Sequence, residues 1–158
     1  MRTSKIMPCL WFDFDAEEAV KHYTSIFKNS KILETSYYGD AVPERKGTAL
    51  TILFELDGLR LRALNGGPEH PFTEAISLSV DCADQAEVDA LWARLSEGGR
   101  EGRCAWLQDK FGLWWQIVPR DLVTMLSDPD SAKASRAMEA MMTMSKIDVA
   151  AMRRAFEG

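Results

Sequence analysis

The chain has 158 residues, of which 46% are hydrophobic, and can bury a core without metal or disulfide cross-links. Its formal net charge of −5 at pH 7 argues against a nucleic acid or an anionic membrane as partner, because such partners need a concentrated basic surface. No apolar run in the sequence approaches the length of a membrane span.

The first half of the sequence predicts one strand, one helix and three further strands. An apolar segment over residues 7–14 precedes an acid-rich stretch whose hydrophobic residues recur at helical spacing, with Asp15 as the expected N-cap. Residues 31–38 and 48–56 are rich in β-branched and aromatic side chains, and residues 57–58 predict a hairpin turn into LRLRALN. The expected order is therefore βαβββ.

The same order restarts after the turn-forming sequence NGGP. Residues 74–82 alternate as a strand, Asp84 predicts the N-cap of a helix, and the glycine pair at 98–99 predicts its end. Two strands are expected over residues 104–107 and 113–118. The second half thus repeats the first in abbreviated form.

From Pro119 the pattern is helical to the end of the sequence, in the segments RDLVTMLS, DSAKASRAMEAMMTM and IDVAAMRRAFEG. The middle segment carries four methionines, whose flexible side chains suit a core or a subunit interface better than a cofactor site. Three helices exceed what two small sheets need for cover. We therefore expect a homodimer that forms through them.

The cysteines indicate the compartment. Cys9, Cys82 and Cys104 are odd in number and lack CxxC spacing, which is typical of a reducing environment and disfavours a disulfide framework. The apolar run at the start is interrupted by Pro8 and reaches Asp13 before a signal-peptide core could form. We expect three buried free thiols and a cytoplasmic protein.

Three stretches, MPCLWFDFDAEEAVKHYTSIF, ALNGGPEHPFTEAISLSV and CAWLQDKFGLWWQIVP, resemble the PhnB-like branch of the vicinal oxygen chelate superfamily, which includes glyoxalase I and bleomycin-resistance proteins. The C-terminal tail is similar to that branch as well. The resemblance implies an α+β fold of paired βαβββ modules, the second abbreviated, whose curved mixed sheets enclose a cleft. It implies a single domain with modules at 1–68 and 72–119 and a helical C-terminal extension at 120–158.

In chelating members of that superfamily, side chains from four strands hold a divalent metal. The resemblance brings these positions to Pro8 or Cys9, to the run LRLRALN, to Ala75 or Glu74, and to Gln116. Proline has no ligand atom, LRLRALN has neither carboxylate nor imidazole, and one neutral amide cannot hold a divalent ion alone. We therefore expect no metal and no other cofactor.

The same branch also carries the label of a 3-demethylubiquinone methyltransferase. A doubly wound methyltransferase places glycines after its first strand, so that the backbone can approach the nucleotide part of S-adenosylmethionine. Here the first strand runs into FDFDAEEA, which contains no glycine and is rich in carboxylates. The residues do not support methyl transfer.

Trp114 and Trp115 are adjacent on a short strand and must point to opposite faces. If Gln116 faces the cleft, Trp114 lies beside it, while Trp115 packs against the helix layer. The same alternation predicts an apolar pocket with a few hydrogen-bonding groups, suited to a small aromatic or amphipathic ligand. The expected ligand-binding residues are Leu10, Phe12, Ser77, Ser79, Trp114 and Gln116; no catalytic residue is assigned. The alternative is that Trp114 and Gln116 fill a closed core.

Three functions are compatible with these residues. The leading hypothesis is a metal-free protein that binds a small molecule between its modules, in the manner of bleomycin-resistance relatives. The second is a metal-dependent lyase, isomerase or dioxygenase of the same superfamily that uses an unfamiliar ligand set such as Glu74 with Gln116. The third is a non-enzymatic interaction module that acts through the methionine-rich helices.

Overall fold

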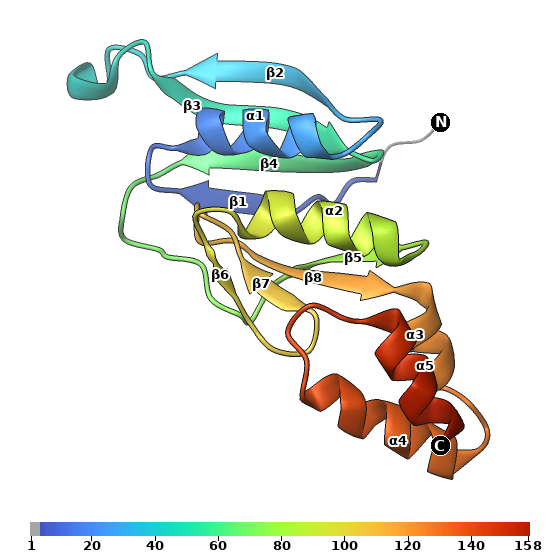
Figure 1. Cartoon of the computed structure of the whole chain (residues 1–158). Coiled ribbons are helices and arrows are strands. Elements are labelled where there is room, and N and C mark those ends of the chain that lie inside the picture. The colour runs from blue at the N-terminus through green and yellow to red at the C-terminus, as the bar shows by residue number, and fades with distance from the viewer. Residues whose placement is uncertain (1–3) are drawn as a thin grey trace. The chain divides into compact units, whose positions relative to one another are not determined.

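The computed structural model describes residues 4–158 and divides into two compact units, of which the first ends at Pro71 and the second begins at Phe72. Each unit contains one four-stranded mixed sheet (Figure 1). The order of strands is β1-β4-β3-β2 in the first sheet and β5-β8-β7-β6 in the second, so both units follow the same βαβββ plan. The α+β fold expected from the sequence is confirmed.

Within residues 4–71, the first unit has one α-helix, one short 3-10 helix and four strands. Its elements are β1 (Cys9–Phe12), α1 (Ala16–Ile26), β2 (Lys31–Tyr37), the 3-10 helix (Pro43–Arg45), β3 (Ala49–Leu56) and β4 (Leu59–Asn65). Strand β1 pairs with β4 in parallel, and the other neighbours pair antiparallel. The amphipathic α1 buries Ala19, Val20 and Tyr23, and it packs against β3 and β4.

Asn65 joins the end of β4 to the start of α1. Its side-chain oxygen accepts a hydrogen bond from the backbone N–H of Ala16 at 2.9 Å, and its amide nitrogen donates to the carbonyl of Ala49 at 3.0 Å. Asp15 occupies the N-cap position as expected, but its side chain makes no capping hydrogen bond. The cap is therefore supplied by a residue that is distant in sequence.

The second unit contains a shorter sheet and four helices. Its elements are β5 (Leu78–Cys82), α2 (Gln85–Ser96), β6 (Arg100–Glu101), β7 (Trp106–Gln108), β8 (Trp114–Pro119), α3 (Arg120–Leu126), α4 (Ser131–Met142) and α5 (Val149–Glu157). The expected strand over residues 74–82 begins only at Leu78, because residues 74–76 form a turn and a bend. The three predicted C-terminal helices are present.

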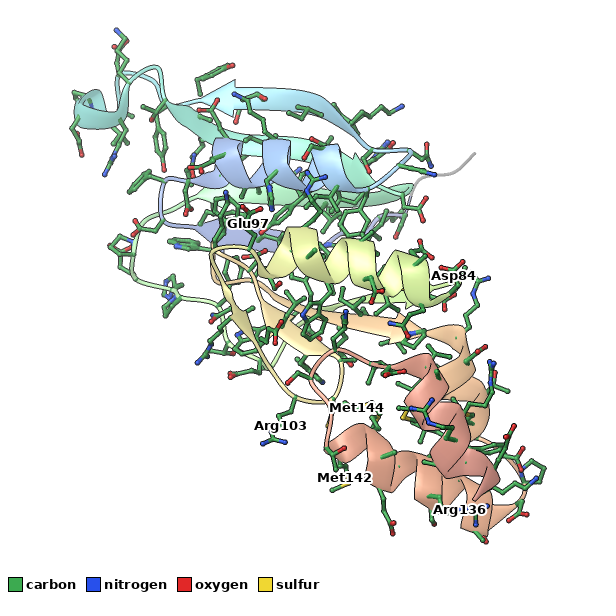
Figure 2. The ribbon with its side chains drawn as sticks, viewed as in Figure 1. Asp84, Glu97, Arg103, Arg136, Met142 and Met144 are labelled. Carbon is green, nitrogen blue, oxygen red and sulfur yellow. The ribbon has the colours of Figure 1, made fainter. Side chains whose placement is uncertain are left out.

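The helix α2 begins with a reciprocal cap. The carboxylate of Asp84 accepts from the backbone N–H of Glu87 at 2.9 Å, and the carboxylate of Glu87 accepts from the backbone N–H of Ala83 at 2.6 Å. The N-cap predicted at Asp84 is confirmed, and together with Glu87 it forms a capping box. Asp84 and Glu97 mark the two ends of α2 in Figure 2.

The C-terminal helices form one apolar cluster with the loop before β7 and the end of β8. Its buried members are Ala105, Leu122, Met125, Ala137, Ile147 and Met152. The segment between α4 and α5 is fixed to α2 by Gln85, whose amide donates to the carbonyl of Ile147 at 2.9 Å and accepts from the N–H of Val149 at 2.8 Å. Within residues 4–158, no helix has the length and apolarity that crossing a bilayer requires.

The three cysteines are free but differ in exposure. The expectation that all are buried is wrong for Cys9, which is exposed at the start of β1, while Cys104 is half-buried. Cys82 is fully buried, and burial together with the carboxylates of Glu87, Asp81 and Asp84 raises its thiol pKa to about 12. Cys82 is therefore an inert core thiol at neutral pH.

Candidate ligand-binding face

Strand β8 presents its two tryptophans to opposite sides of the second sheet. Trp115 and Ile117 are buried on the side that packs against α2, as the alternation of the strand predicted. The indole N–H of Trp115 donates to Oδ2 of Asp109 at 2.9 Å. Trp115 is thus a core anchor and leaves the opposite side of β8 to Trp114 and Gln116.

Asp109 is the polar centre of the turn before β8. It is 3% exposed, and its Oδ1 accepts from the backbone N–H groups of Phe111 and Leu113 at 2.9 Å and 3.0 Å. With the indole bond of Trp115, one carboxylate therefore holds the whole DKFGLWW turn. This role of Asp109 was not predicted from the sequence.

Trp114 belongs to an aromatic group on the opposite side of the sheet. Its ring lies edge to face with that of Trp106, with centroids 6.4 Å apart, and the guanidinium carbon of Arg100 lies 5.0 Å from its centroid. Arg100 is oriented by Gln108, whose side-chain oxygen accepts from its Nε at 2.8 Å. Trp114 is 6% exposed, while Trp106 and Gln108 are half-buried.

Gln116 supplies a fixed polar group beside these rings. Its amide nitrogen donates to the hydroxyl oxygen of Ser77 at 2.9 Å, and Gln116 pairs in register with Ser79 on β5 and with Trp106 on β7. Ser79 is exposed, and Gln116 and Ser77 are half-buried. We call this surface the ligand face, and define it by Ser77, Ser79, Trp106, Trp114 and Gln116.

Leu10 and Phe12 lie elsewhere, and their orientation differs from the expected one. They pair in register with Ala63 and Asn65, and Asn65 contacts the start of α1, so both side chains belong to the core beneath α1. Phe12 is 1% exposed. The opposite side of β1 carries Trp11, because alternation along a strand reverses with each residue.

The indole of Trp11 packs against the loop formed by the LNGGP stretch and accounts for its first glycine. Its indole N–H donates to the carbonyl of Gly67 at 2.8 Å, and its ring lies edge to face with that of His70, with centroids 4.7 Å apart. A Cβ atom at Gly66 would lie 2.3 Å from the indole, so only glycine allows this approach. The motif thus has a structural role within the first unit.

The donor set does not fit a metal at the positions that chelating relatives use. Pro8 carries no donor atom, Ala75 offers only a methyl group, and the amide nitrogen of Gln116 is directed at Ser77. Glu74 is exposed in the turn before β5. Among the side chains of residues 4–158, no three histidines, cysteines or carboxylates form a group that could hold a metal ion.

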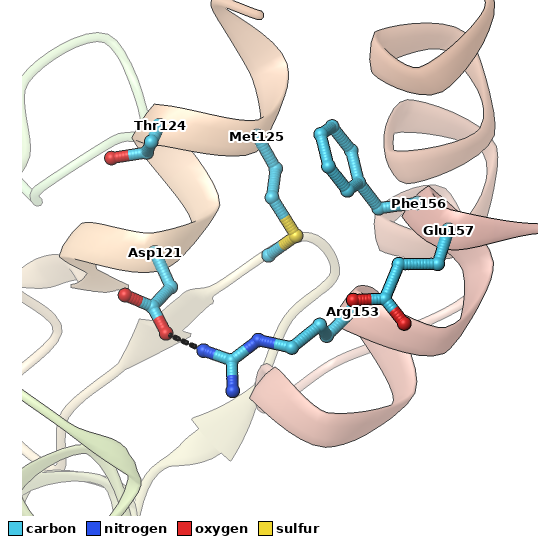
Figure 3. Close-up of a pocket in the computed structure, with 6 residues that line it drawn as sticks. All are labelled: Asp121, Thr124, Met125, Arg153, Phe156 and Glu157. Carbon is cyan, nitrogen blue, oxygen red and sulfur yellow. Dashed lines mark hydrogen bonds and ion pairs between the residues drawn. The ribbon is translucent and has the colours of Figure 1, made fainter.

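A separate hollow of about 200 Å³ lies between α3 and α5 (Figure 3). Its lining residues are Asp121, Thr124, Met125, Arg153, Phe156 and Glu157. A guanidinium nitrogen of Arg153 donates to Oδ2 of Asp121 and so ties α5 to α3. The sequence predicted only packing here, because helical periodicity does not show where two helices leave a gap.

The paired βαβββ units define the class of protein, and comparisons with solved structures support it. The PhnB protein of Bacillus cereus, described as a 3-demethylubiquinone-9 3-methyltransferase, is 32% identical with a TM-score of 0.67, over 73% of this chain and 99% of that one. Protein PA1353 of Pseudomonas aeruginosa is 22% identical with a TM-score of 0.60, over 74% of this chain and 98% of that one.

A more distant match shows the fold alone. The fosfomycin resistance protein FosX of Listeria monocytogenes, solved with Mn(II) and sulfate, is 14% identical with a TM-score of 0.52, over 75% of this chain and 91% of that one. PhnB and FosX are members of the vicinal oxygen chelate superfamily, and this chain shares their fold.

Residues 4–118 match the model of the family described as 3-demethylubiquinone-9 3-methyltransferase, and the chain belongs to this PhnB-like family. The resemblance recognised from the sequence is confirmed. No curated protein matches the chain. The family match ends before α3, so the resemblance of the C-terminal tail stays a prediction.

Proposed function

We propose that the chain binds a small aromatic or amphipathic molecule on the ligand face of its second unit, without a metal ion. The observation that supports this most directly is the geometry of Gln116. Ser77 holds its amide nitrogen at 2.9 Å, which fixes the direction of the side-chain carbonyl beside Trp106 and Trp114. A flat ligand can contact an indole while it donates a hydrogen bond to that carbonyl.

The chemistry of the ligand follows from the same groups. The rings of Trp106 and Trp114 favour an aromatic body, and the carbonyl of Gln116 favours a hydroxyl or N–H donor on that body. Arg100 adds a cation above Trp114, 5.0 Å from its ring centroid. A phenol is therefore a suitable probe, because it combines one ring with one donor.

We propose binding without a metal because the chain offers too few donor atoms at the positions concerned. Holding a divalent ion requires several nitrogen, oxygen or sulfur ligands to offset its dehydration, and Pro8, Ala75 and Gln116 provide too few. A lyase, isomerase or dioxygenase that depends on a metal would need Glu74, which is exposed in a turn. Elemental analysis of purified protein tests this, and one tightly held metal per chain would refute it.

We further propose that the family description does not extend to methyl transfer by this chain. The segment between β1 and α1 contains Asp13, Phe14 and Asp15, without the glycines that let a backbone approach a nucleotide. Both sheets are mixed and four-stranded, unlike a doubly wound parallel sheet. Calorimetric titration with S-adenosylmethionine should give no binding.

The exposed free thiol of Cys9 is compatible with a reducing cytoplasm, which we propose as the location.

The binding proposal is tested by titrating para-cresol and a library of small aromatic compounds while following tryptophan fluorescence. Gln116→Leu should weaken binding by about 1–3 kcal/mol, because the ligand donor loses its acceptor. Thr35→Val, a similar loss of a half-buried polar group in the first unit, is the control and should bind as the parent does. Equal affinities of the parent and Gln116→Leu would assign Gln116 to packing alone.

A further inference from the structure

We propose that the helices α3–α5 form an end wall on the ligand face and limit the length of the molecule that it accepts. This inference rests on the binding function proposed above and adds a determinant of its specificity. The wall is built by residues 120–158, beyond the segment that matches the family.

Val118 marks the place where the wall meets the ligand face. It lies two residues after Gln116 on β8, so the alternation of the strand puts both side chains on the same side of the sheet. Val118 is half-buried and packs against the apolar cluster that contains Leu122 and Met125. The C-terminal helices therefore cover the Gln116 side of the sheet at Val118, the next residue of β8 on that side.

An ion pair joins α3 to the neighbouring position on β5. Asp81 pairs in register with Val118 and lies on the same side of the sheet. Its Oδ2 accepts from Nε of Arg120, the first residue of α3, at 2.8 Å. Ser79, two residues earlier on β5 and paired in register with Gln116, is exposed as well. The ion pair thus ties the start of α3 to β5 at this end of the face, although both of its side chains stay largely exposed.

The wall extends across the sheet to β7. The backbone N–H groups of Cys104 and Ala105 donate to the carbonyls of Met144 and Ser145, at 2.9 Å and 3.0 Å. These two residues directly precede Trp106 and belong to the loop that leads into β7. The segment between α4 and α5 is consequently held next to the aromatic group of the ligand face.

The helices of the wall are fixed relative to each other, while the methionine side chains on them are flexible. Arg153 ties α5 to α3 through Asp121, as Figure 3 shows, and this restricts movement between the two helices. Met125 and Met144 contribute flexible thioether side chains to the cluster. We expect such a wall to tolerate ligands of different outline while excluding those that extend past Val118.

The comparison with PhnB is consistent with a determinant particular to this chain. The match covers 99% of the Bacillus cereus protein but only 73% of this chain. A quarter of this chain thus has no counterpart there, and the family match also ends at residue 118. A relative without the helices would leave the Val118 end of the face open.

A series of para-alkylphenols from para-cresol to para-hexylphenol tests the inference, with dissociation constants from tryptophan fluorescence. The measured quantity is the ratio of the affinities for the long and the short phenol, which cancels any general loss of binding. The full chain is compared with a chain that ends at Pro119 and with Met144→Ala. Met138→Ala is the matched control, because Met138 is 41% exposed and lies outside the cluster.

We expect the ratio to shift in favour of para-hexylphenol by about 10-fold in the shortened chain, the scale on which a pocket discriminates single methylene groups. Met144→Ala should shift it in the same direction by a smaller factor, and Met138→Ala should leave it unchanged. Circular dichroism establishes whether the shortened chain keeps its fold; if it does not, Met144→Ala decides. Binding of all phenols with an unchanged ratio would overturn the end wall alone. Failure of every phenol to bind would overturn the proposed function and the wall with it.

Discussion

Replacing Asp109 by asparagine should destabilise the second unit more than any exposed acidic substitution. The carboxylate accepts three hydrogen bonds in a buried turn, two from backbone N–H groups and one from the indole of Trp115. If the remaining oxygen of asparagine keeps the two backbone bonds, its NH₂ group faces the indole N–H. Two donors then oppose each other where a charged acceptor had been.

The magnitude follows from these contacts. A hydrogen bond to a charged group contributes about 1.5–3 kcal/mol, and an unsatisfied buried donor costs about 1–3 kcal/mol. We expect Asp109→Asn to lower the free energy of unfolding by about 3 kcal/mol. In a double-mutant cycle with Trp115→Phe, the coupling between the two side chains should be about 2 kcal/mol.

Urea denaturation followed by far-ultraviolet circular dichroism measures these values without relying on tryptophan emission. Asp40→Asn is the control, because Asp40 is exposed and pairs with the exposed Lys46 at the surface of the first unit. Its stability should stay close to that of the parent. A coupling below about 0.5 kcal/mol would show that the indole and the carboxylate act independently, and would refute the role assigned to Asp109.

Three further outcomes are expected. Iodoacetamide should modify the exposed Cys9 in the native protein at neutral pH but not the buried Cys82. The pKa of Cys82 is about 12 in the folded state against 9.0 for an ordinary thiol. The contribution of this thiol to stability is therefore complete below about pH 9 and declines as the pH rises towards 12. Early alkylation of Cys82 would contradict its burial. Gly66→Ala should displace the indole of Trp11 and cost about 1–3 kcal/mol of stability, and unchanged unfolding would show that the loop relaxes freely. We also propose a homodimer, for which light scattering should report two chains, and a chain truncated before Asp130 should be less soluble; a mass of one chain would contradict the dimer.

The order of elements could be predicted because each element has a local cause. Helical spacing of apolar residues predicted α1, and Asp84 as an N-cap predicted the start of α2. The opposite orientations of Trp114 and Trp115 followed from the two-residue period of a strand alone. These inferences needed no knowledge of distant contacts.

The orientation of β1 could not be predicted on the same basis. Cys9, Leu10, Trp11 and Phe12 are all apolar, so the sequence offers no polar residue to distinguish its two sides. Choosing the wrong side moves every side chain to the other face, and this is the difference found for Leu10 and Phe12.

Long-range polar contacts were equally hidden. Asn65 caps a helix that begins 49 residues earlier, and no local pattern announces such a contact. The three bonds of Asp109 and the hollow between α3 and α5 also depend on how separate elements meet. Alternation did bring Ser77, Ser79, Trp114 and Gln116 to one side of the second sheet, but it could not indicate that Gln116 would be oriented by Ser77.

The contact between the loop before β7 and the C-terminal helices has a consequence for how such a chain can change over evolution. Ala105 donates its N–H to Ser145 and accepts from the N–H of Ile117, so a single residue links the C-terminal helices to the strand that bears Gln116. Cys104 and Ala105 both adopt positive φ angles, of 56° and 75°, which are uncommon and unfavourable for residues other than glycine. Helices held by backbone groups place little demand on side-chain identity at the junction, yet their loss would remove the acceptors of the Cys104 and Ala105 N–H groups directly before β7. Gain or loss of the helices would therefore be selected together with the strand rather than as an independent event.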